Sequence, residues 1–303
     1  VFERAGDAAT AEANLAAVEH SLGEADAAVK LPLKALFAPA MRLVMTIGVS
    51  IAILQQITGI NSVFFYAPMI FEQAGVGTDA AFMQAVLVGV VNLAFTVLAM
   101  MLIDKLGRRP LLGFGLSGIA VCMFLLSYGF GSATYTLPTD VDVPQSIDTG
   151  ALQPVLGVEY GSDDEFLKAV SAAIGMQAFK DNESQLVGAA IDLNASLILV
   201  GILGFVASFA ISLGPVMWVL FSELFPNHLR GLAISFAGLI NSAVSFGVQL
   251  LFPWELENLG NALTFLIYGG FALLGLVLFM RILPETRGRS LEELEELLVG
   301  EKQ

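Results

Sequence analysis

Residues 55–61 read QQITGIN, and they lie inside the otherwise apolar segment MRLVMTIGVSIAILQQITGINSVFFYAPMIF, which runs from 41 to 71. Two adjacent amides are costly to bury unless hydrogen-bonding partners reach them. The glycine at 59 adds a point at which a helix can unwind. This stretch therefore predicts a membrane-spanning helix that is interrupted by a polar site.

The composition of the whole chain places it in a membrane. Of its 303 residues, 56% are hydrophobic and 14% are charged, whereas soluble domains carry about 25% charged residues. The formal net charge of −14 argues against nucleic acid as a partner. The single cysteine, Cys122, excludes a disulfide within the chain. The chain begins with valine and no signal-peptide pattern precedes the first apolar run, so we expect a fragment or a processed product.

Six apolar segments are long enough to cross a bilayer, which takes roughly 17 to 25 helical residues. None of them has a Lys, Arg, Asp or Glu well inside its core. We therefore expect an all-α membrane protein with its transmembrane helices in two groups of three, at 41–131 and 193–283. The six segments lie near 41–71, 81–103, 111–131, 193–222, 232–252 and 262–283.

Positive charge orients these segments. Twelve of the fourteen Lys and Arg residues fall on one side of the predicted membrane, and the other two, Lys168 and Lys180, lie in the long 132–192 connection. The positive-inside rule then puts both ends of the chain in the cytoplasm. We expect the plasma (inner) membrane as the location.

Residues 132–192 form an acidic extracytoplasmic insertion that is far longer than an ordinary connection. Its stretch DDEFLKAVSAAIGMQAF (163–179) predicts one amphipathic helix with acids at its start, so the insertion is expected to be partly folded. Asn182-Glu183-Ser184 matches a glycosylation sequon, which is informative only in a eukaryotic secretory pathway. The sequence leaves the insertion open between a cation site or lid and a solvated insertion without such a role.

Two flanking segments complete the predicted organisation. Residues 1–40 are expected to form cytoplasmic linker helices, because 8–29 are rich in Ala and Glu with apolar residues on one helical face. Residues 284–303 are expected to form a cytoplasmic tail helix, since a capping box at Ser290 opens the stretch SLEELEELL. Both would pack on the cytoplasmic ends of the bundle, and binding of a partner is the alternative.

The first and fourth apolar segments differ from the other four in the same way. Each is about 30 residues long, or ~45 Å as a helix, against a hydrocarbon core of ~30 Å. Each is also interrupted, the first by QQITGIN and Pro68, and the fourth by Ser212, Gly214 and Pro215. They hold the same position in two successive triplets. Paired interruptions of this kind are typical of transporters built from inverted repeats, where they mark the binding site.

Polar residues in the spans indicate a cavity for a neutral solute. At about 100° per residue, the polar side chains of 55–61 spread around most of the helix circumference. Asn92, Asn241 and Trp218 fall at similar depth in other spans. Amides donate and accept as hydroxyls do, and an indole offers a flat apolar face, so we expect a neutral, polyhydroxylated cargo. The alternative is helix–helix bonding by isolated amides, worth about 0.6–2 kcal/mol each.

Four motifs, in this order, resemble the carboxyl-terminal half of the sugar porters of the major facilitator superfamily. The resemblance implies a twelve-helix transporter of which this chain carries six helices, arranged as two inverted three-helix repeats. The missing N-terminal six-helix half would complete the cavity and would carry the acid that couples sugar to protons. The motifs are QQITGINSVFFYAP (55–68), DKLGRRP (104–110), GPVMWVLFSELFPNHLRG (214–231) and PETRGRS (284–290).

This resemblance also implies which residues bind sugar. Two positions depart from the family pattern: Phe65 stands where tyrosine is usual in the gate region, and Ser242 stands where a tryptophan is common. The resemblance therefore implies a sugar without fixing which one. The residues on sugar-binding positions are Gln55, Gln56, Asn61, Asn92 and Trp218, and Asn241 stands where the family has Gln or Asn.

Charged residues on the cytoplasmic side resemble the gating network of the same family. Ion pairs there would join the two halves while the cavity faces outward and would break as it turns inward, which biases a two-state rocking equilibrium. The alternative is that the basic residues serve only topology and headgroup contact, which leaves the interleaved acids unexplained. His228 is expected to be incidental. The network residues are Asp104, Arg108, Arg109, Glu223, Arg230 and Glu285.

We therefore expect transport of a neutral monosaccharide, a pentose or a hexose, by alternating access coupled to protons in symport. The partners would be the sugar, protons, the bilayer and the missing half. Two alternatives stay open: a sugar sensor with a transporter fold but no flux, and a facilitator of a polyol or another non-sugar solute. No metal-ligand cluster or nucleophile–base pair occurs in the spans, so the sequence predicts no enzyme and no metal or cofactor.

Overall fold

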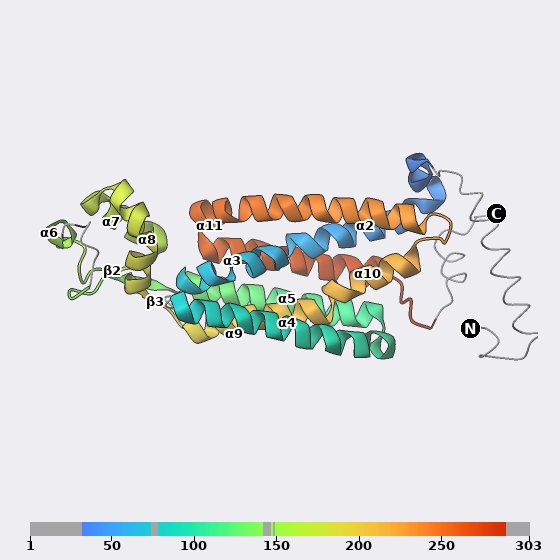
Figure 1. The fold of residues 1–303 in the computed structure, drawn as a ribbon, viewed down its shortest axis with the longest axis horizontal. Coiled ribbons are helices and arrows are strands. Elements are labelled where there is room, and N and C mark those ends of the chain that lie inside the picture. The colour runs from blue at the N-terminus through green and yellow to red at the C-terminus, as the bar shows by residue number, and fades with distance from the viewer. Residues whose placement is uncertain (1–31, 74–77, 142–146, 148, 289–303) are drawn as a thin grey trace, which may run out of the picture.

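The computed structural model describes residues 32–73, 78–141, 147 and 149–288 as a long helical bundle with a smaller folded unit at one end (Figure 1). The linker helix expected within 8–29 and the tail helix expected after 290 lie outside these residues. The described chain opens with two short 3-10 turns, η2 (Leu33–Phe37) and η3 (Pro39–Met41).

Both long apolar segments are broken helices, as their sequences predict, but Pro68, predicted as part of the first interruption, lies inside a helix and does not end it. The first helix of the first pair ends before Gly59, which has a φ of 85°, and the break in the second pair falls at Ser212 (φ −129°, ψ −95°). Each pair forms a 30-residue apolar span. Non-helical backbone at membrane depth is tolerated only where protein or a polar cavity surrounds it. The pairs are α2 (Arg42–Ile57) with α3 (Ile60–Gln73), and α9 (Ala195–Ile211) with α10 (Leu213–Leu224).

Three further helices complete the bundle: α4 (Thr78–Leu106), α5 (Arg108–Gly131) and α11 (Arg230–Ile282). The described residues thus contain five helical segments long and apolar enough to cross a membrane. α11 alone contains two arms, which meet at Gly260, where φ is 73° and ψ is 164°. The chain reverses there, and the second arm runs back beside the first (Figure 1). The two arms account for the fifth and sixth predicted segments.

The predicted end of the fifth segment at 252 is wrong. The helix continues through Pro253 and ends only at the kink at Gly260. Proline is tolerated inside membrane helices because neighbouring groups satisfy the freed carbonyl. The expected loop at 253–261 is therefore mostly an extra two turns of helix, and these turns carry Glu255 and Glu257.

Each broken span packs closely against the last span of the other triplet. On α11, Gly275 faces Leu54 of α2, and an added Cβ there would come within 2.4 Å of the leucine side chain. Gly201 and Gly204 of α9 face α5 in the same manner. Small residues allow such close approach between membrane helices. The two triplets are thus joined through reciprocal contacts.

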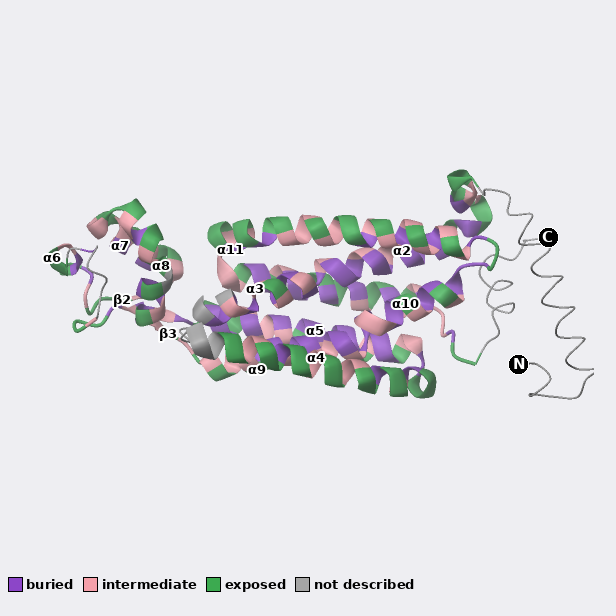
Figure 2. Cartoon of the chain, in the orientation of Figure 1, coloured by how far each residue is buried: buried purple, intermediate pink, exposed green. Residues whose placement is uncertain are grey.

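The helices differ in how much of their surface is buried inside the bundle (Figure 2). The span formed by α2 and α3 has the largest buried share, and α4 has the smallest. Exposed apolar side chains follow the length of α4, among them Phe82, Leu93 and Met101. This surface indicates a covering of lipid or another protein segment, because water-soluble proteins rarely expose so long an apolar stripe without a partner.

The insertion between the two triplets is a folded unit with its own core. Three short strands form a sheet in the order β2-β1-β3, with both pairs antiparallel. Phe166, Val170 and Phe179 are fully buried against this sheet. The elements are β1 (Thr134–Thr136), α6 (Thr149–Leu152), β2 (Glu159–Tyr160), α7 (Asp163–Ile174), α8 (Met176–Ala190) and β3 (Ile191–Asp192).

The single helix predicted over 163–179 is two helices. α7 begins as expected, because the Ser162 hydroxyl accepts a hydrogen bond from the backbone N–H of Glu165 at 3.3 Å. It ends at Gly175, whose φ of 87° breaks the helix before α8 starts. The apolar face of the stretch continues across the break, which is why its pattern reads as one helix.

Candidate functional site

The break between α2 and α3 places a set of amides at the centre of the bundle. Gln55 and Gln56 lie in the last turn of α2, and Asn61 lies in the first turn of α3. Gly59 lies between them in the left-handed region that favours glycine. Gln55 and Gln56 are each only 6% exposed, so their amide groups need partners inside the protein.

Hydrogen bonds join four of the predicted amides into one network. Asn61 Nδ2 donates to Gln56 Oε1 across the break at 2.8 Å. Gln56 Nε2 donates to Gln55 Oε1 and to Asn241 Oδ1, each at 3.1 Å. Asn241 Nδ2 donates to Gln55 Oε1 at 2.8 Å and to the Ala52 carbonyl at 2.9 Å. The first broken span and the first arm of α11 thus share one polar centre.

The second break contributes a backbone acceptor to this network. Gln55 Nε2 donates to the carbonyl of Leu213 at 3.2 Å, just after the break at Ser212. The two interruptions that the sequence pairs are therefore linked by one side chain. In this structure the amides mainly satisfy one another. A solute would have to exchange for some of these bonds.

Two polar residues of α11 that the sequence analysis did not single out also belong to the network. Ser245 Oγ accepts from Asn61 Nδ2 at 2.8 Å and from Gln249 Nε2 at 2.9 Å. With Asn241 these residues are spaced by four, so they lie along one face of the helix. That spacing was readable from the sequence. It extends the polar face from the amides toward the insertion.

Asn92 and Trp218 lie outside the hydrogen-bond network of the described residues. Asn92 is half-buried on α4, where its carbonyl accepts from Thr96 Oγ1 at 2.7 Å. The Trp218 side chain is 52% exposed and packs edge-on against Phe221, with ring centroids 5.7 Å apart. Phe65 and Ser242, the two departures from the family pattern, are also exposed. These four side chains are free to face a partner segment or a solute.

A second polar cluster forms at the end of the bundle opposite the insertion, called here the basic end, where Arg108 and Arg109 start α5. Arg108 pairs with Asp104 at 3.0 Å and with Glu223 of α10 at 2.7 Å. Thr286 Oγ1 donates to the other oxygen of Glu223 at 2.7 Å. Three segments far apart in the sequence therefore converge on the Arg108–Glu223 pair.

Glu285 caps the N-terminus of α5. Its two carboxylate oxygens accept from the backbone N–H groups of Arg108 and Arg109, each at 3.1 Å. A helix N-terminus leaves such groups unpaired and favours negative charge. Gly107, with a φ of 95°, leaves room for the carboxylate, which a Cβ would meet at 2.8 Å.

Arg109 and Arg230 do not pair with the predicted acids. The Arg109 guanidinium donates to the Met280 carbonyl, and Arg230 Nε donates to the Phe225 carbonyl at 3.1 Å. Both side chains thus donate to backbone carbonyls at the end of a helix or in a turn. His228 is exposed. The predicted network thus forms around Arg108, Glu223 and Glu285, with Arg230 apart from it.

The insertion carries acids with raised pKa values. Burial raises the pKa of Asp163, and the neighbouring charge of Asp164 raises it further. Burial also raises the pKa of Glu183, with added repulsion from Asp163 and Glu257. Lys180 pairs with Glu257 of α11 at 3.4 Å across two exposed side chains. Within the described residues, no group of three or more His, Cys, Asp or Glu is placed to hold a metal ion.

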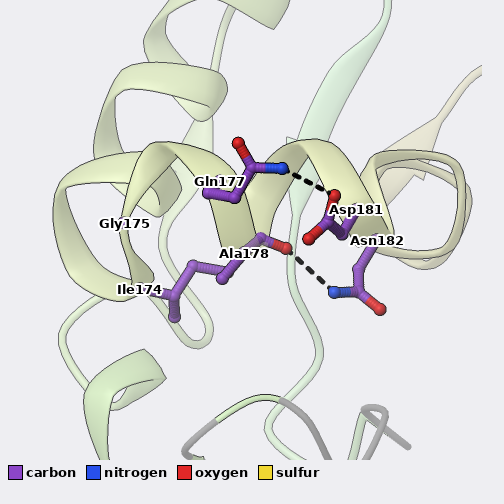
Figure 3. A pocket seen from close by; sticks show the side chains of 6 residues that line it. All are labelled: Ile174, Gly175, Gln177, Ala178, Asp181 and Asn182. Carbon is purple, nitrogen blue, oxygen red and sulfur yellow. Dashed lines mark hydrogen bonds between the residues drawn. The ribbon is translucent and has the colours of Figure 1, made fainter.

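A shallow hollow lies on the insertion beside the start of α8 (Figure 3). Its polar groups are already paired with one another, since Gln177 Nε2 donates to Asp181 Oδ1 and Asn182 Nδ2 donates to the Ala178 carbonyl, both at 2.9 Å. The sequon amide of Asn182 is thus bonded within α8. The hollow lies apart from the amide network of the bundle.

A bundle of apolar spans, with two of them broken around a cluster of amides, is an architecture typical of multi-pass membrane transporters built from repeats. The chain matches the family described as sugar (and other) transporter over residues 1–143 and 168–298, and it belongs to that family.

Relatives and solved structures agree with this assignment. The chain is 35% identical to the D-xylose-proton symporter of Escherichia coli (strain K12) over 84% of its length and 41% of that protein. It is 31% identical to the glucose facilitated diffusion protein of Zymomonas mobilis, over 84% and 43%. The structure of the major facilitator superfamily proton:xylose symporter XylE bound to 6-bromo-6-deoxy-D-glucose matches with a TM-score of 0.62 and 31% identity, over 95% of this chain and 48% of that one. The chain has the fold of half of such a transporter, and it spans less than half the length of these relatives.

Proposed function

We propose that this chain is the carboxyl-terminal half of a transporter that moves a neutral monosaccharide, a pentose or a hexose, by alternating access. The network of Gln55, Gln56, Asn61 and Asn241 carries the proposal. It offers both donors and acceptors at the centre of the bundle and no charged side chain. Family membership supports a sugar as cargo, since curated relatives include symporters and a facilitator of sugars.

Trp218 and Asn92 would complete the sugar site. Their side chains are at least partly accessible and are not bound into the network of the described residues. An indole face would stack on the C–H side of a sugar ring while the amides bind its hydroxyls. The missing N-terminal half would close the cavity over them.

Alternating access would use the charged cluster at the basic end. Arg108 and Glu223 join α5 to α10, and their side chains are only 12% and 16% exposed. Such pairs can favour one of two packed states of a bundle. We place this end, and both ends of the chain, in the cytoplasm of a plasma membrane protein, because twelve of the fourteen Lys and Arg residues belong to this side.

Proton coupling is the proposed energy source, with the coupling acid in the missing half. The xylose-proton symporter is more similar in sequence than the glucose facilitator, which favours symport. If the protein were a facilitator instead, the same amides would still form the proposed sugar site.

The test is uptake of radiolabelled xylose, glucose, arabinose and xylitol by transporter-deficient cells that express the full-length gene product. Gln56→Ala and Trp218→Ala should abolish saturable uptake. Gln177→Ala and Trp254→Ala are matched controls at exposed positions and should leave uptake unchanged. A proton uncoupler should stop accumulation if the transporter is a symporter.

Other outcomes separate the alternatives. Sugar binding to the purified protein without any uptake would favour a sensor. Uptake of xylitol in preference to every sugar would favour a polyol facilitator. No response to any of these solutes would contradict the sugar proposal.

A further inference from the structure

The helix break that holds the amides is packed against one aromatic ring. Gly59 lies opposite Tyr268 of the second arm of α11, and a Cβ at Gly59 would come within 2.3 and 2.4 Å of two carbons of that ring. Tyr268 is 2% exposed. The ring therefore occupies the space that a side chain at the break would need.

A carboxylate fixes the position of this ring. The Tyr268 hydroxyl donates to Glu255 Oε2 at 2.7 Å, the length of a charge-assisted bond. Glu255 lies on the first arm of α11 and Tyr268 on the second, on either side of the kink at Gly260. Phe252 stacks on Tyr268 with ring centroids 6.1 Å apart. One hydrogen bond thus spans the reversal of α11 and ends at the ring beside Gly59.

The same contact reaches the residues that follow the break. The Ser62 hydroxyl, three residues after Gly59, is fully buried and has no hydrogen-bond partner among the described residues. Tyr66, one turn further, packs against Phe252 at 5.3 Å. The start of α3, which carries Asn61, therefore rests on the Phe252–Tyr268 pair.

Register across the break decides where the amides meet. Asn61 of α3 binds Gln56 of α2 at 2.8 Å only because the backbone turns at Thr58 and Gly59. An acid held half-buried at the end of an apolar span is costly and marks a functional role more often than a structural one.

We propose that Tyr268 and Glu255 are positioning residues for the solute-binding amides. Tyr268 fills the space opposite Gly59, Glu255 fixes the ring, and together they keep Asn61 in register with Gln56. This inference rests on the proposed function, because it assigns the pair to the affinity of that site. It predicts that losing the hydroxyl weakens sugar binding without any contact between Tyr268 and sugar.

The test measures the Kd for sugar on purified full-length protein, with the amount of folded protein and the Tm recorded for every variant. Tyr268→Phe keeps the ring and removes the hydroxyl, and Glu255→Leu removes the acceptor. Each should raise the Kd about tenfold per folded molecule. Glu255→Gln keeps an acceptor and should recover most of the affinity. Tyr128→Phe, which removes an exposed hydroxyl on α5, should bind as the unmodified protein does.

The double variant shows whether the two residues act through one bond, and the comparison of Kd with Tm separates positioning from general stability. The double variant Tyr268→Phe/Glu255→Leu should bind no more weakly than either single variant, because both remove the same bond. A lower Tm with a Kd within twofold of the unmodified protein would overturn the inference and leave the proposed function intact. If the unmodified protein binds no sugar, both fail together.

Discussion

The two broken spans solve the same steric problem in opposite ways. At the first break the broken helix supplies the glycine, Gly59, and the neighbouring α11 supplies the bulky ring of Tyr268. At the second break the broken helix keeps a side chain, Ser212, and the neighbouring α5 supplies the glycine. A Cβ at Gly115 would lie 1.7 Å from Ser212 Oγ.

This difference follows what each break contributes to the site. The first break brings amide side chains together from both of its half-helices, so it needs an unusual backbone conformation that only glycine adopts freely. The second contributes a backbone carbonyl, that of Leu213, and the φ of Ser212 is −129°, so this break does not use the left-handed region that favours glycine. Two spans in equivalent positions of the repeats have thus been specialised, one for side-chain recognition and one for backbone support.

The largest expected effect is that of Gly59→Ala. The alanine would carry a φ of 85°, at a cost of about 1–3 kcal/mol, and would collide with the Tyr268 ring, at a similar cost. The measurement is the Tm of the detergent-solubilised full-length protein. Compared with Tyr268→Leu alone, which itself loses the bond to Glu255, the double variant Gly59→Ala/Tyr268→Leu should lose only the stability that the backbone strain costs. No loss in that comparison would show that the backbone is not strained, contrary to this comparison of the breaks.

Gly115→Ala should come next, with a loss of about 1–3 kcal/mol from overpacking against Ser212. Here the second substitution Ser212→Gly should restore the part of the stability lost to the serine side chain, because no positive φ is involved. The contact between the new Cβ and the Ser208 carbonyl, at 2.9 Å, would remain. Gly89→Ala is the matched control on α4, since nothing lies within 4 Å of its Cβ position. Failure of Ser212→Gly to rescue would place the strain elsewhere on α5.

Gln55→Leu tests the link between the two breaks. The substitution removes the side-chain donor to the Leu213 carbonyl and one of the acceptors of the Gln56 and Asn241 amide nitrogens, a penalty of about 1–3 kcal/mol. We expect the Kd for sugar to rise about tenfold or more, measured by calorimetry on the full-length protein. Gln153→Leu, on the exposed surface of the insertion, is the control. An unchanged Kd would mean that Gln55 serves helix packing alone.

Glu223→Gln should have the smallest effect. The amide oxygen can still accept from Arg108, and the amide nitrogen can donate to the Thr286 hydroxyl, so mainly the charge of a partly buried pair is lost. We expect a loss of about 1 kcal/mol in stability, between the values for exposed and buried pairs, seen as a small drop in Tm. Asp104→Asn, at a side chain 78% exposed, should be neutral. If Asp104→Asn lowered the Tm more than Glu223→Gln, Asp104 and not Glu223 would be the more important partner of Arg108.

Much of the bundle was predictable because its patterns are local. Apolar length gives the spans, and QQITGIN and Ser212 mark the two breaks without any knowledge of contacts. Gly175 and Pro253 were misread for the same reason. The helix ends at Gly175, although the amphipathic pattern continues, and it runs on through Pro253, although the apolar run ends there. Tertiary packing decides whether a helix continues at such a residue.

The candidate site was predictable only in part. The amides of 55–61 and Asn241 could be selected because buried polar residues are costly, and the spacing of Ser245 and Gln249 from Asn241 would have added two more. That they bond one another could not be read, since it depends on how α2 and α11 cross. The Glu255–Tyr268 bond was also hidden, because it joins two arms of a reversal whose kink is not evident in sequence.

The sheet of the insertion has a practical consequence for engineering. Strand β1 leaves α5 and strand β3 leads into α9, and the two pair directly, with Thr134 opposite Asp192. Paired residues of an antiparallel ladder lie about 4.5–5.5 Å apart. The points at which the chain enters and leaves the insertion are therefore equally close to each other. A reporter domain whose own ends lie that close can be exchanged for residues 137–190. The protein would then carry its label at the insertion end of the bundle without a change in the connection between its two triplets.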